Sequence, residues 1–567
     1  MKLPARLACF LLLAAAAGCA SLPSLENRPA TTAIRDTGDT RLGKAIAPLA
    51  ARNGARPAEP DAYRKPGLPV RAGLYPLSGG REALAARVVL ADAAERSLDI
   101  QYYIWRNDRS GTFMFDAIRR AADRGVRVRL LLDDNGTAGQ DSILWALDRH
   151  PMIEVRLFNP FVQRNARLIG YLTDFSRLNR RMHNKSFTAD NQATIIGGRN
   201  IGDEYFDATD DRAFADLDVL AVGAIVDQVS TAFDRYWSSE SAFPVDRLLK
   251  PSSDEEVSGL LEQVAQAPAG PGYLEYTEAV QKTVFLRDLF EGRLGLEWAE
   301  TRMVSDDPGK ALGKMPPPVP LPERMERLFG QPRQVLELVS PYFVPLQEGV
   351  DYLVGLARSG VQVRVLTNSL AATDVVAVHA GYARWRKDLL AAGITLHEYK
   401  PLAPPPKSGA EAESRKAGSS SGRRTERAAG GIGRDRAGGL AGSFGGSGIW
   451  RRGGYGGSGS SLHAKTFTVD RSRVVIGSFN FDPRSLNLNT ELGFVIDSAA
   501  IASAVDDAYT RNVPLTAWQV TLSEEGELQW TEQADGVVVR HDEEPGAGLW
   551  RRLGAGAVSI LPIDWLL

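Results

Sequence analysis

Arg181-Met-His-Asn-Lys-Ser-Phe-Thr-Ala-Asp190, followed by Gly-Gly-Arg-Asn at residues 197–200, is the first copy of a pattern that occurs twice in this chain. The second copy reads His463-Ala-Lys-Thr-Phe-Thr-Val-Asp470 and is followed by Gly-Ser-Phe-Asn at residues 477–480, with every spacing kept. The chain has six histidines in 567 residues, and two of them begin this repeat. The repeat therefore predicts one site made of two equivalent halves.

Each copy of the repeat has the pattern of a β-hairpin. The histidine, lysine and phenylalanine alternate with smaller residues, so they project from one side of a strand. Turn residues begin at Asp190 and Asp470, and the apolar runs behind them predict the return strand. Each aspartate is therefore expected to shape a turn. Gly197 and Gly477 end the return strands and leave room for a ligand or a neighbouring backbone.

The residue types of the repeat suit phosphoryl transfer. One histidine can attack a phosphorus atom while the other protonates the leaving oxygen. The two lysines and two asparagines can neutralise charge on the remaining phosphate oxygens, so this scheme needs no metal ion and no cofactor. A single His-x-Lys copy is more often an ordinary histidine, but the matched duplicate argues against that alternative. The candidates are, for catalysis, His183, Lys185, Asp190, His463, Lys465 and Asp470, and for phosphate binding, Asn200, Asn480 and Ser478.

The paired motifs resemble those of the phospholipase D superfamily. The flanking sequences are similar to bacterial cardiolipin synthases of the C type, at residues 101–105, 130–135, 171–175 and 199–203. The resemblance implies two similar α/β lobes, packed face to face about a pseudo-two-fold axis, with both histidine–lysine sets at the seam. It also implies a phosphatidyl-histidine intermediate, with His183 as the nucleophile and His463 as the acid and then the base.

Two carboxylates at matching positions are candidates to support the histidines. Residues 214–218 line up with residues 489–493, which places Asp216 opposite Glu491. A carboxylate that accepts one imidazole N–H fixes the tautomer and leaves the other nitrogen reactive. The alternative is that both are ordinary acids at a strand edge.

Three residues of the second half lie where the family has residues near its head-group pocket. They are Asn368, Asp374 and His379. His379 falls on an apolar helix and is expected to be structural.

The order of elements predicts a mixed, largely parallel α/β fold in each half, because helices alternate with apolar strands. The first half is expected to contain a helix at 84–97, a strand at 98–105, a helix at 113–124 and a strand at 126–132. The second half repeats this order with a strand at 335–340, a helix at 350–359 and a strand at 361–366. The expected divisions are a signal peptide (1–19), a tether (20–74), lobe 1 (75–247), an interlobe connection (248–322), lobe 2 (323–500) and a C-terminal extension (501–567).

The first residues predict a lipoprotein signal. A short basic start is followed by the apolar run 7–17, which is too short to span a bilayer. Ala16-Ala-Gly-Cys19 resembles a bacterial lipobox, so Cys19 is the expected lipidation site and the only cysteine of the mature chain. We therefore expect a bacterial cell-envelope protein, lipid-anchored and facing the periplasm, at the outer membrane rather than the inner membrane.

Composition excludes global disorder and gives no sign of nucleic-acid binding. The chain is 44% hydrophobic and 24% charged, which is ordinary for a folded protein. Its formal net charge of -2 lacks the basic excess that nucleic-acid binding requires. Residues 404–460 are rich in Gly, Ser and Arg and are expected to form a disordered insertion without function, although their positive charge could also favour an anionic membrane.

Four functions follow from these features. The leading hypothesis is a phosphatidyltransferase that makes cardiolipin from phosphatidylglycerol together with phosphatidylglycerol or phosphatidylethanolamine. The same site using water would be a phospholipase D that releases phosphatidic acid. A nuclease of the same superfamily would need a basic groove, and a catalytically silent lipoprotein would be expected to have lost a motif residue. Membrane phospholipids are therefore the expected partners.

Overall fold

The computed structural model describes residues 21–55, 67–207, 214–314, 321–401, 461–534 and 537–559. The predicted signal peptide with Cys19 and the predicted insertion at 404–460 lie outside the described residues. Among the described residues, no helix combines the length and apolar character needed to cross a membrane.

Lobe 1 is a mixed sheet with helices on its faces. Its strands are β1 (Val70–Leu77), β2 (Ser97–Ile104), β3 (Arg127–Gly136), β4 (Ile153–Phe158), β5 (Ser186–Ala189), β6 (Ala193–Gly197), β8 (Asp218–Gly223) and β9 (Ala242–Pro244). β2, β3 and β4 are parallel, and the other strands pair antiparallel in the spatial order β9-β4-β3-β2-β5-β6-β8-β1. Its helices are α3 (Gly80–Ala93), α4 (Arg109–Asp123), α5 (Asp141–Asp148), α6 (Arg167–Thr173), α7 (Phe175–Leu178) and α8 (Ile225–Trp237).

Lobe 2 repeats this arrangement. Its strands are β10 (Glu297–Ser305), β11 (Val335–Val339), β12 (Gln362–Asn368), β13 (Thr395–Tyr399), β15 (Thr466–Val469), β16 (Arg473–Gly477), β17 (Leu492–Asp497), β18 (Ala517–Leu522), β19 (Leu528–Ala534) and β20 (Val537–His541). Here β11, β12 and β13 are the parallel group. The helices are α12 (Leu321–Phe329), α13 (Leu346–Arg358), α14 (Val376–Ala383), α15 (Arg386–Ala391), α17 (Pro483–Asn487), α18 (Ala499–Thr516) and α19 (Leu549–Ser559).

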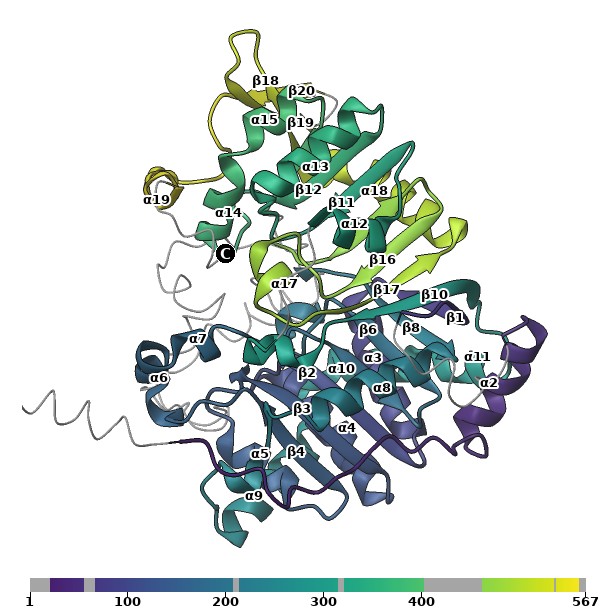
Figure 1. The fold of residues 1–567 in the computed structure, drawn as a ribbon. Coiled ribbons are helices and arrows are strands. Elements are labelled where there is room, and N and C mark those ends of the chain that lie inside the picture. Colours follow the sequence, from purple (N-terminus) through teal and green to yellow (C-terminus); the bar gives the residue numbers. More distant parts are fainter. Residues whose placement is uncertain are drawn as a thin grey trace, which may run out of the picture.

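One continuous sheet of 18 strands passes through both lobes. β1 pairs antiparallel with β10, β8 lies beyond β1, and β17 lies beyond β10. The strand order on one side of the β1–β10 pair mirrors the order on the other, as a pseudo-two-fold axis requires. Figure 1 shows lobe 1 in purple and blue below this junction and lobe 2 in green and yellow above it. The predicted mixed α/β fold is confirmed, but the sheets are not largely parallel, because among the described strands of each lobe the parallel pairing is limited to β2-β3-β4 and to β11-β12-β13.

The expectation of a tether at 20–74 is wrong for the residues that the structure describes. The segment before α2 (Arg41–Arg52) lies along lobe 1, where Arg28 donates to the carbonyl of Ala242 (2.6 Å) and Ala33 N–H donates to Asp234 (3.0 Å). β1, at the end of the supposed tether, is a central strand of the sheet.

The helix α2 explains why the segment folds. Thr40 caps it by accepting a hydrogen bond from Gly43 N–H (3.1 Å). Leu42, Ile46 and Leu49 then fall on one face at helical spacing and pack into the core of lobe 1. The Ala-, Arg- and Pro-rich composition around this short apolar stripe concealed it.

Two other expected boundaries also need correction. The connection at 248–322 contains β10, which is the first strand of lobe 2, and the helices α9 (Asp254–Gln266), α10 (Leu274–Lys282) and α11 (Phe285–Phe290), which add Val264, Tyr276 and Leu289 to the lobe 1 core. The extension at 501–567 contains most of α18, which packs against lobe 2, and all of β18, which pairs with β13 and extends the sheet of that lobe.

Packing of α2 is testable through stability. Leu42→Ala removes a fully buried side chain, so we expect it to lower the free energy of unfolding by about 2–5 kcal/mol. Lys44→Ala, on the exposed face of the same helix, should change it by less than about 0.5 kcal/mol. Equilibrium unfolding in urea measures both values. Equal, small effects would mean that α2 does not belong to the folded unit.

Candidate active site

The two hairpins of the repeat place their histidines at one end of a strand and their aspartates at the other. In β5–β6 the turn begins at Asp190 (φ 50°) and Asn191 (φ 51°), residue types that tolerate left-handed backbone. The Asp190 carboxylate accepts hydrogen bonds from the backbone N–H groups of Arg96 (2.7 Å) and Ser97 (3.0 Å) at the start of β2. It thus fastens the hairpin to the neighbouring strand.

Asp470 does the same in lobe 2. Its carboxylate accepts backbone hydrogen bonds from Arg333 (2.9 Å), Gln334 (2.7 Å) and Val335 (3.0 Å), at the start of β11. The expectation that each motif aspartate shapes a turn agrees with this geometry. Their inclusion in the catalytic set is wrong, because Asp190 and Asp470 lie at the strand ends opposite the histidines.

The backbone beside each histidine is held by the other lobe. His183 N–H donates to the carbonyl of Thr490 (2.9 Å), and His463 N–H donates to the carbonyl of Ala215 (2.8 Å). Before His463, β14 (Ser461–Leu462) pairs in parallel with β7 (Phe214–Ala215). Each lobe therefore forms part of the other lobe's half-site.

The carboxylates at the matched positions cross the seam in the same way. His183 Nδ1 lies 2.9 Å from Glu491 Oε2, and His463 Nδ1 lies 2.5 Å from Asp216 Oδ2. All four side chains are largely buried. Because Nδ1 of each imidazole is occupied by a carboxylate, Nε2 is the nitrogen left for chemistry.

The two lysines lie beside the histidines in the same buried space. Lys185 Nζ donates to the His183 carbonyl (2.6 Å), and Lys465 Nζ lies 3.0 Å from His463 Nδ1 and also donates to the His463 carbonyl. Burial lowers the pKa of Lys185 to about 7 and that of Lys465 to about 8, although nearby carboxylates oppose the shift. An anion in the cleft would stabilise both ammonium charges.

Burial also favours the neutral form of both imidazoles. It lowers the pKa of His183 to about 4 and that of His463 to about 3, with the lysine charges adding to the effect and the carboxylates opposing it. Burial disfavours the charged form of Asp216, but the hydrogen bond with His463 and the positive charge of Lys465 outweigh it and hold the pKa of Asp216 at about 2. A neutral imidazole is the form that acts as a nucleophile or a base.

A narrow cleft of about 50 Å³ separates the two histidines. Tyr103 contacts His183 edge-on (ring centroids 5.0 Å apart), and Tyr205 contacts His463 in the same way (5.1 Å). Arg484 also lines the cleft and donates to the Asn179 side chain (2.8 Å). The two tyrosines and Arg484 are site residues that the sequence analysis missed, because only the fold brings these distant residues together.

The candidate phosphate-binding residues are not equivalent. The Asn200 side chain is used within lobe 1, since it accepts from Ile104 N–H (3.1 Å) and donates to the Tyr205 hydroxyl (3.0 Å). Asn200 and Asn480 both line the cleft, but the Asn480 Oδ1 is buried without a hydrogen-bond partner among the described residues. Ser478 is fully buried and donates to Glu491, so its expected role in phosphate binding is wrong.

The three residues expected near the head-group pocket also have different positions. Asp374 lines the cleft, where its carboxylate accepts a hydrogen bond from the Tyr342 hydroxyl (3.0 Å). The Asn368 side chain donates to the carbonyl of Leu462 (3.0 Å) and so holds β14 in front of His463. His379 contacts Arg386 (2.7 Å) outside the cleft, as a structural residue would.

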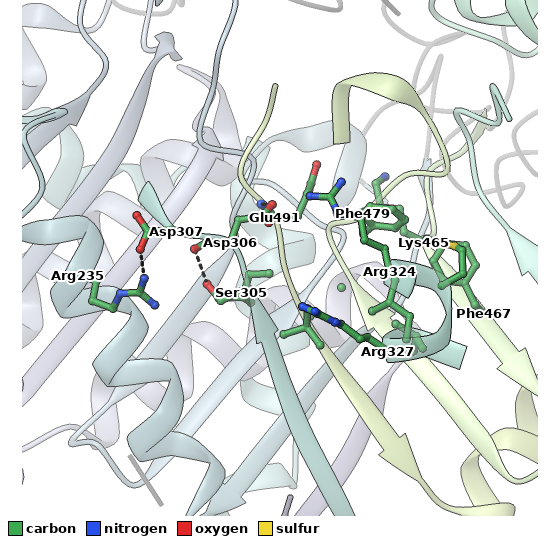
Figure 2. A pocket seen from close by; sticks show the side chains of 17 residues that line it. Arg235, Ser305, Asp306, Asp307, Arg324, Arg327, Lys465, Phe467, Phe479 and Glu491 are labelled. Carbon is green, nitrogen blue, oxygen red and sulfur yellow. Dashed lines mark hydrogen bonds and ion pairs between the residues drawn. The ribbon is translucent and has the colours of Figure 1, made fainter. Parts of the chain in front are cut away.

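An apolar cavity of about 390 Å³ lies on the other side of Lys465 and Glu491 (Figure 2). Its apolar lining includes Phe467, Phe479 and Leu492. Charged side chains, among them Asp306, Arg324 and Arg327, line the rest of this cavity. Among the described residues, no group of three or more His, Cys, Asp or Glu side chains is arranged to hold a metal ion.

The anchoring role of Asp190 predicts a loss of stability. Asp190→Ala removes a carboxylate that accepts hydrogen bonds from Glu95, Arg96 and Ser97, so we expect the free energy of unfolding to fall by about 1.5–3 kcal/mol or more. Urea denaturation checks the value, and Asp174→Ala, at the end of the short helix α6, serves as the control. An unchanged midpoint would contradict the anchoring role.

The buried neutral histidines predict an acid-sensitive fold. An unfolded chain takes up protons at pKa 6.5, but folded His183 does so only at about 4 and His463 at about 3. Unfolding therefore takes up protons in this window, and the free energy of unfolding should fall as the pH falls from about 6.5 to about 4. His183→Asn and His463→Asn should each flatten this dependence. Parallel pH curves for all variants would refute the explanation.

The similarity of this chain to known proteins agrees with its fold and site. Residues 89–237 and 450–512 match the family model described as cardiolipin synthase, PLD-like domain. Cardiolipin synthase C of Escherichia coli (strain K12) is 43% identical over 527 residues, which cover 93% of this chain and 100% of that protein. An uncharacterized protein of Helicobacter pylori (strain ATCC 700392 / 26695) is 29% identical over 495 residues, 86% of this chain and 88% of that protein.

A solved structure supports the fold independently of sequence. The phosphatidylserine synthase of Haemophilus influenzae Rd KW20 aligns over 92% of this chain and 100% of its own, with a TM-score of 0.50 and 11% identity. Because the sequence identity is so low, this likeness concerns the fold alone. The 43% identity over nearly the whole chain, together with the duplicated motif and the paired lobes, shows the family. The chain belongs to the cardiolipin synthase family of phospholipase D-like phosphatidyltransferases.

Proposed function

We propose that this enzyme makes cardiolipin by moving a phosphatidyl group from one phospholipid to the hydroxyl of phosphatidylglycerol. The observation that supports it best is the pair of buried imidazoles that face one cleft, each held at Nδ1 by a carboxylate of the opposite lobe. A double displacement needs two such groups at one phosphorus atom. The 43% identical relative named cardiolipin synthase C supports the same reaction.

In the first step, Nε2 of His183 attacks the phosphorus of the donor phospholipid. A P–N bond forms, the P–O bond to the head group breaks, and His463 gives a proton to the leaving oxygen. The product is a phosphatidyl-histidine and a free head-group alcohol, which is glycerol when phosphatidylglycerol is the donor. The phosphodiester is an anion, and its charge opposes the desolvation that lowers the pKa of His463.

In the second step, the hydroxyl of phosphatidylglycerol attacks the same phosphorus. His463, now neutral, accepts the proton of that hydroxyl, the new P–O bond forms, and the P–N bond to His183 breaks. Both histidines return to their starting forms. Exclusion of water from the cleft distinguishes this transfer from hydrolysis to phosphatidic acid.

The assignment of roles to the histidines rests on the asymmetry of their partners. The 2.5 Å contact between Asp216 and His463 suits an imidazolium, which a general acid must form. Glu491, the partner of His183, also accepts hydrogen bonds from Ser478 and Ser485, so its negative charge is shared with two hydroxyl groups. His183 is therefore the better candidate for the nucleophile.

The remaining polar groups of the cleft would bind the phosphate. Lys185 and Lys465 supply positive charge, and Asn480 can offer its amide N–H to a non-bridging oxygen. These charges come from side chains of the repeat, and we propose that no metal ion takes part. We further propose that Cys19 is acylated and holds the enzyme at the bacterial envelope, facing the periplasm, where its phospholipid substrates lie.

Substitution of either histidine tests the proposed function. His183→Ala and His463→Ala should each lower cardiolipin formation from phosphatidylglycerol vesicles by about a thousandfold or more, because each cycle needs both groups. Mass spectrometry of the lipids measures the product, and His541→Ala, on the edge strand β20, is the matched control.

Three results would revise the proposal. Near-normal cardiolipin formation by either active-site variant would exclude the two-histidine mechanism. Phosphatidic acid as the sole product of the wild type would make the enzyme a hydrolase. Cleavage of DNA without any phospholipid product would favour a nuclease.

A further inference from the structure

Two helices, one on each lobe, have exposed apolar side chains. On α6, Ile169 is 42% exposed and Leu172 is 77% exposed. On α19, the exposed fractions are 60% for Leu549, 74% for Trp550 and 54% for Leu553. Ile169 lies three residues before Leu172, and Leu549 and Trp550 lie four and three residues before Leu553, which places each group on one helix face. Leu172 and Trp550 have the highest exposed fractions among the large hydrophobic side chains of the described residues.

The helix α6 is connected to the cleft wall through its buried side. The Tyr171 hydroxyl donates to Asn135 (3.0 Å), whose amide lies 3.4 Å from the Tyr103 hydroxyl. Tyr103 in turn contacts His183 edge-on. The exposed face of α6 is therefore separated from the histidine of lobe 1 by a short series of directly contacting side chains.

The helix α19 is connected to the cleft wall of lobe 2. Arg551 donates to the Thr373 carbonyl (2.5 Å), and the next residue, Asp374, lines the cleft together with Tyr342. The other side of α19 is buried, since Ala555 packs against lobe 2. Figure 1 shows α6 and α19 on the same side of the molecule, one on each lobe.

We propose that the exposed faces of α6 and α19 form one lipid-docking surface that inserts into the boundary between head groups and acyl chains and holds the cleft against the bilayer. This inference rests on the proposed function, because a cleft that receives the phosphodiester of a membrane lipid must meet the bilayer surface. Leucine and tryptophan are suited to that boundary. A bilayer also accounts for two separate apolar faces on one side, since a flat surface can meet both at once.

Quenching of tryptophan fluorescence tests the surface in the full-length chain. Vesicles of phosphatidylglycerol and phosphatidylethanolamine are prepared with and without bromine on the acyl chains. We expect the brominated vesicles to quench part of the emission, and Trp550→Phe to abolish most of that quenching. Leu172→Ser/Leu549→Ser/Leu553→Ser should also reduce the quenching and lower the initial rate of cardiolipin formation about fivefold or more, because it removes the apolar area that inserts.

The matched control is Leu515→Ser/Val537→Ser/Val538→Ser, which removes side chains that are 66%, 62% and 57% exposed on α18 and β20. It should leave quenching and rate nearly unchanged. If the α6–α19 variant keeps the wild-type quenching, the docking surface is refuted and the proposed function stands. If quenching changes as expected while the wild type forms no product from any phospholipid, the surface stands and the proposed function fails. Equal losses in the control variant would also refute the surface.

Discussion

The contact between each histidine and a carboxylate of the opposite lobe is the interaction on which the site depends. A buried imidazole gains a fixed tautomer only if a partner occupies one nitrogen, and here Glu491 and Asp216 reach across the seam to do so. Neither lobe has a complete half-site by itself. The duplication therefore makes the lobes depend on each other, because each lobe supplies the carboxylate that orients the histidine of the other.

The position of the seam is fixed by the sheet. β1 and β10 pair along the pseudo-two-fold axis, so a shift of one residue in their register would turn the side chains of each strand to the opposite face. The exchanged backbone hydrogen bonds of His183 with Thr490 and of His463 with Ala215 add a second point of attachment. Two attachments at a distance from each other restrict rotation of one lobe against the other. This restraint keeps both imidazoles directed at one cleft.

The sequence predicted the structure correctly where side chains alternate along a short strand and turn residues follow. The repeat predicted both hairpins and the turns at Asp190 and Asp470, because alternation and turn residues act over a few positions. The pairing of the two lobes was implied by the family resemblance. The sequence pattern did not predict α2, whose apolar stripe is three residues long in an Ala- and Arg-rich segment. The sequence pattern also placed Ser478 in the phosphate site. Spacing along a strand does not show which hydroxyl donates a hydrogen bond to a buried carboxylate, and here the Ser478 hydroxyl donates to Glu491. Tyr103 and Tyr205 were missed for a related reason, because they are distant from the motifs and meet the histidines only in the folded chain.

Burial is both a cost to the site and the origin of its reactivity. Burial lowers the pKa of His183 and His463 and of Lys185 and Lys465, so the site holds less positive charge than four basic side chains would have in water. An anionic phosphodiester reverses this balance, because it stabilises the ammonium and imidazolium forms that burial disfavours. Binding of substrate and protonation of the general acid are therefore linked by the same electrostatic interaction. An uncharged ligand of similar shape would bind without raising the pKa of His463, and the site thus favours phosphodiesters through charge as well as through fit.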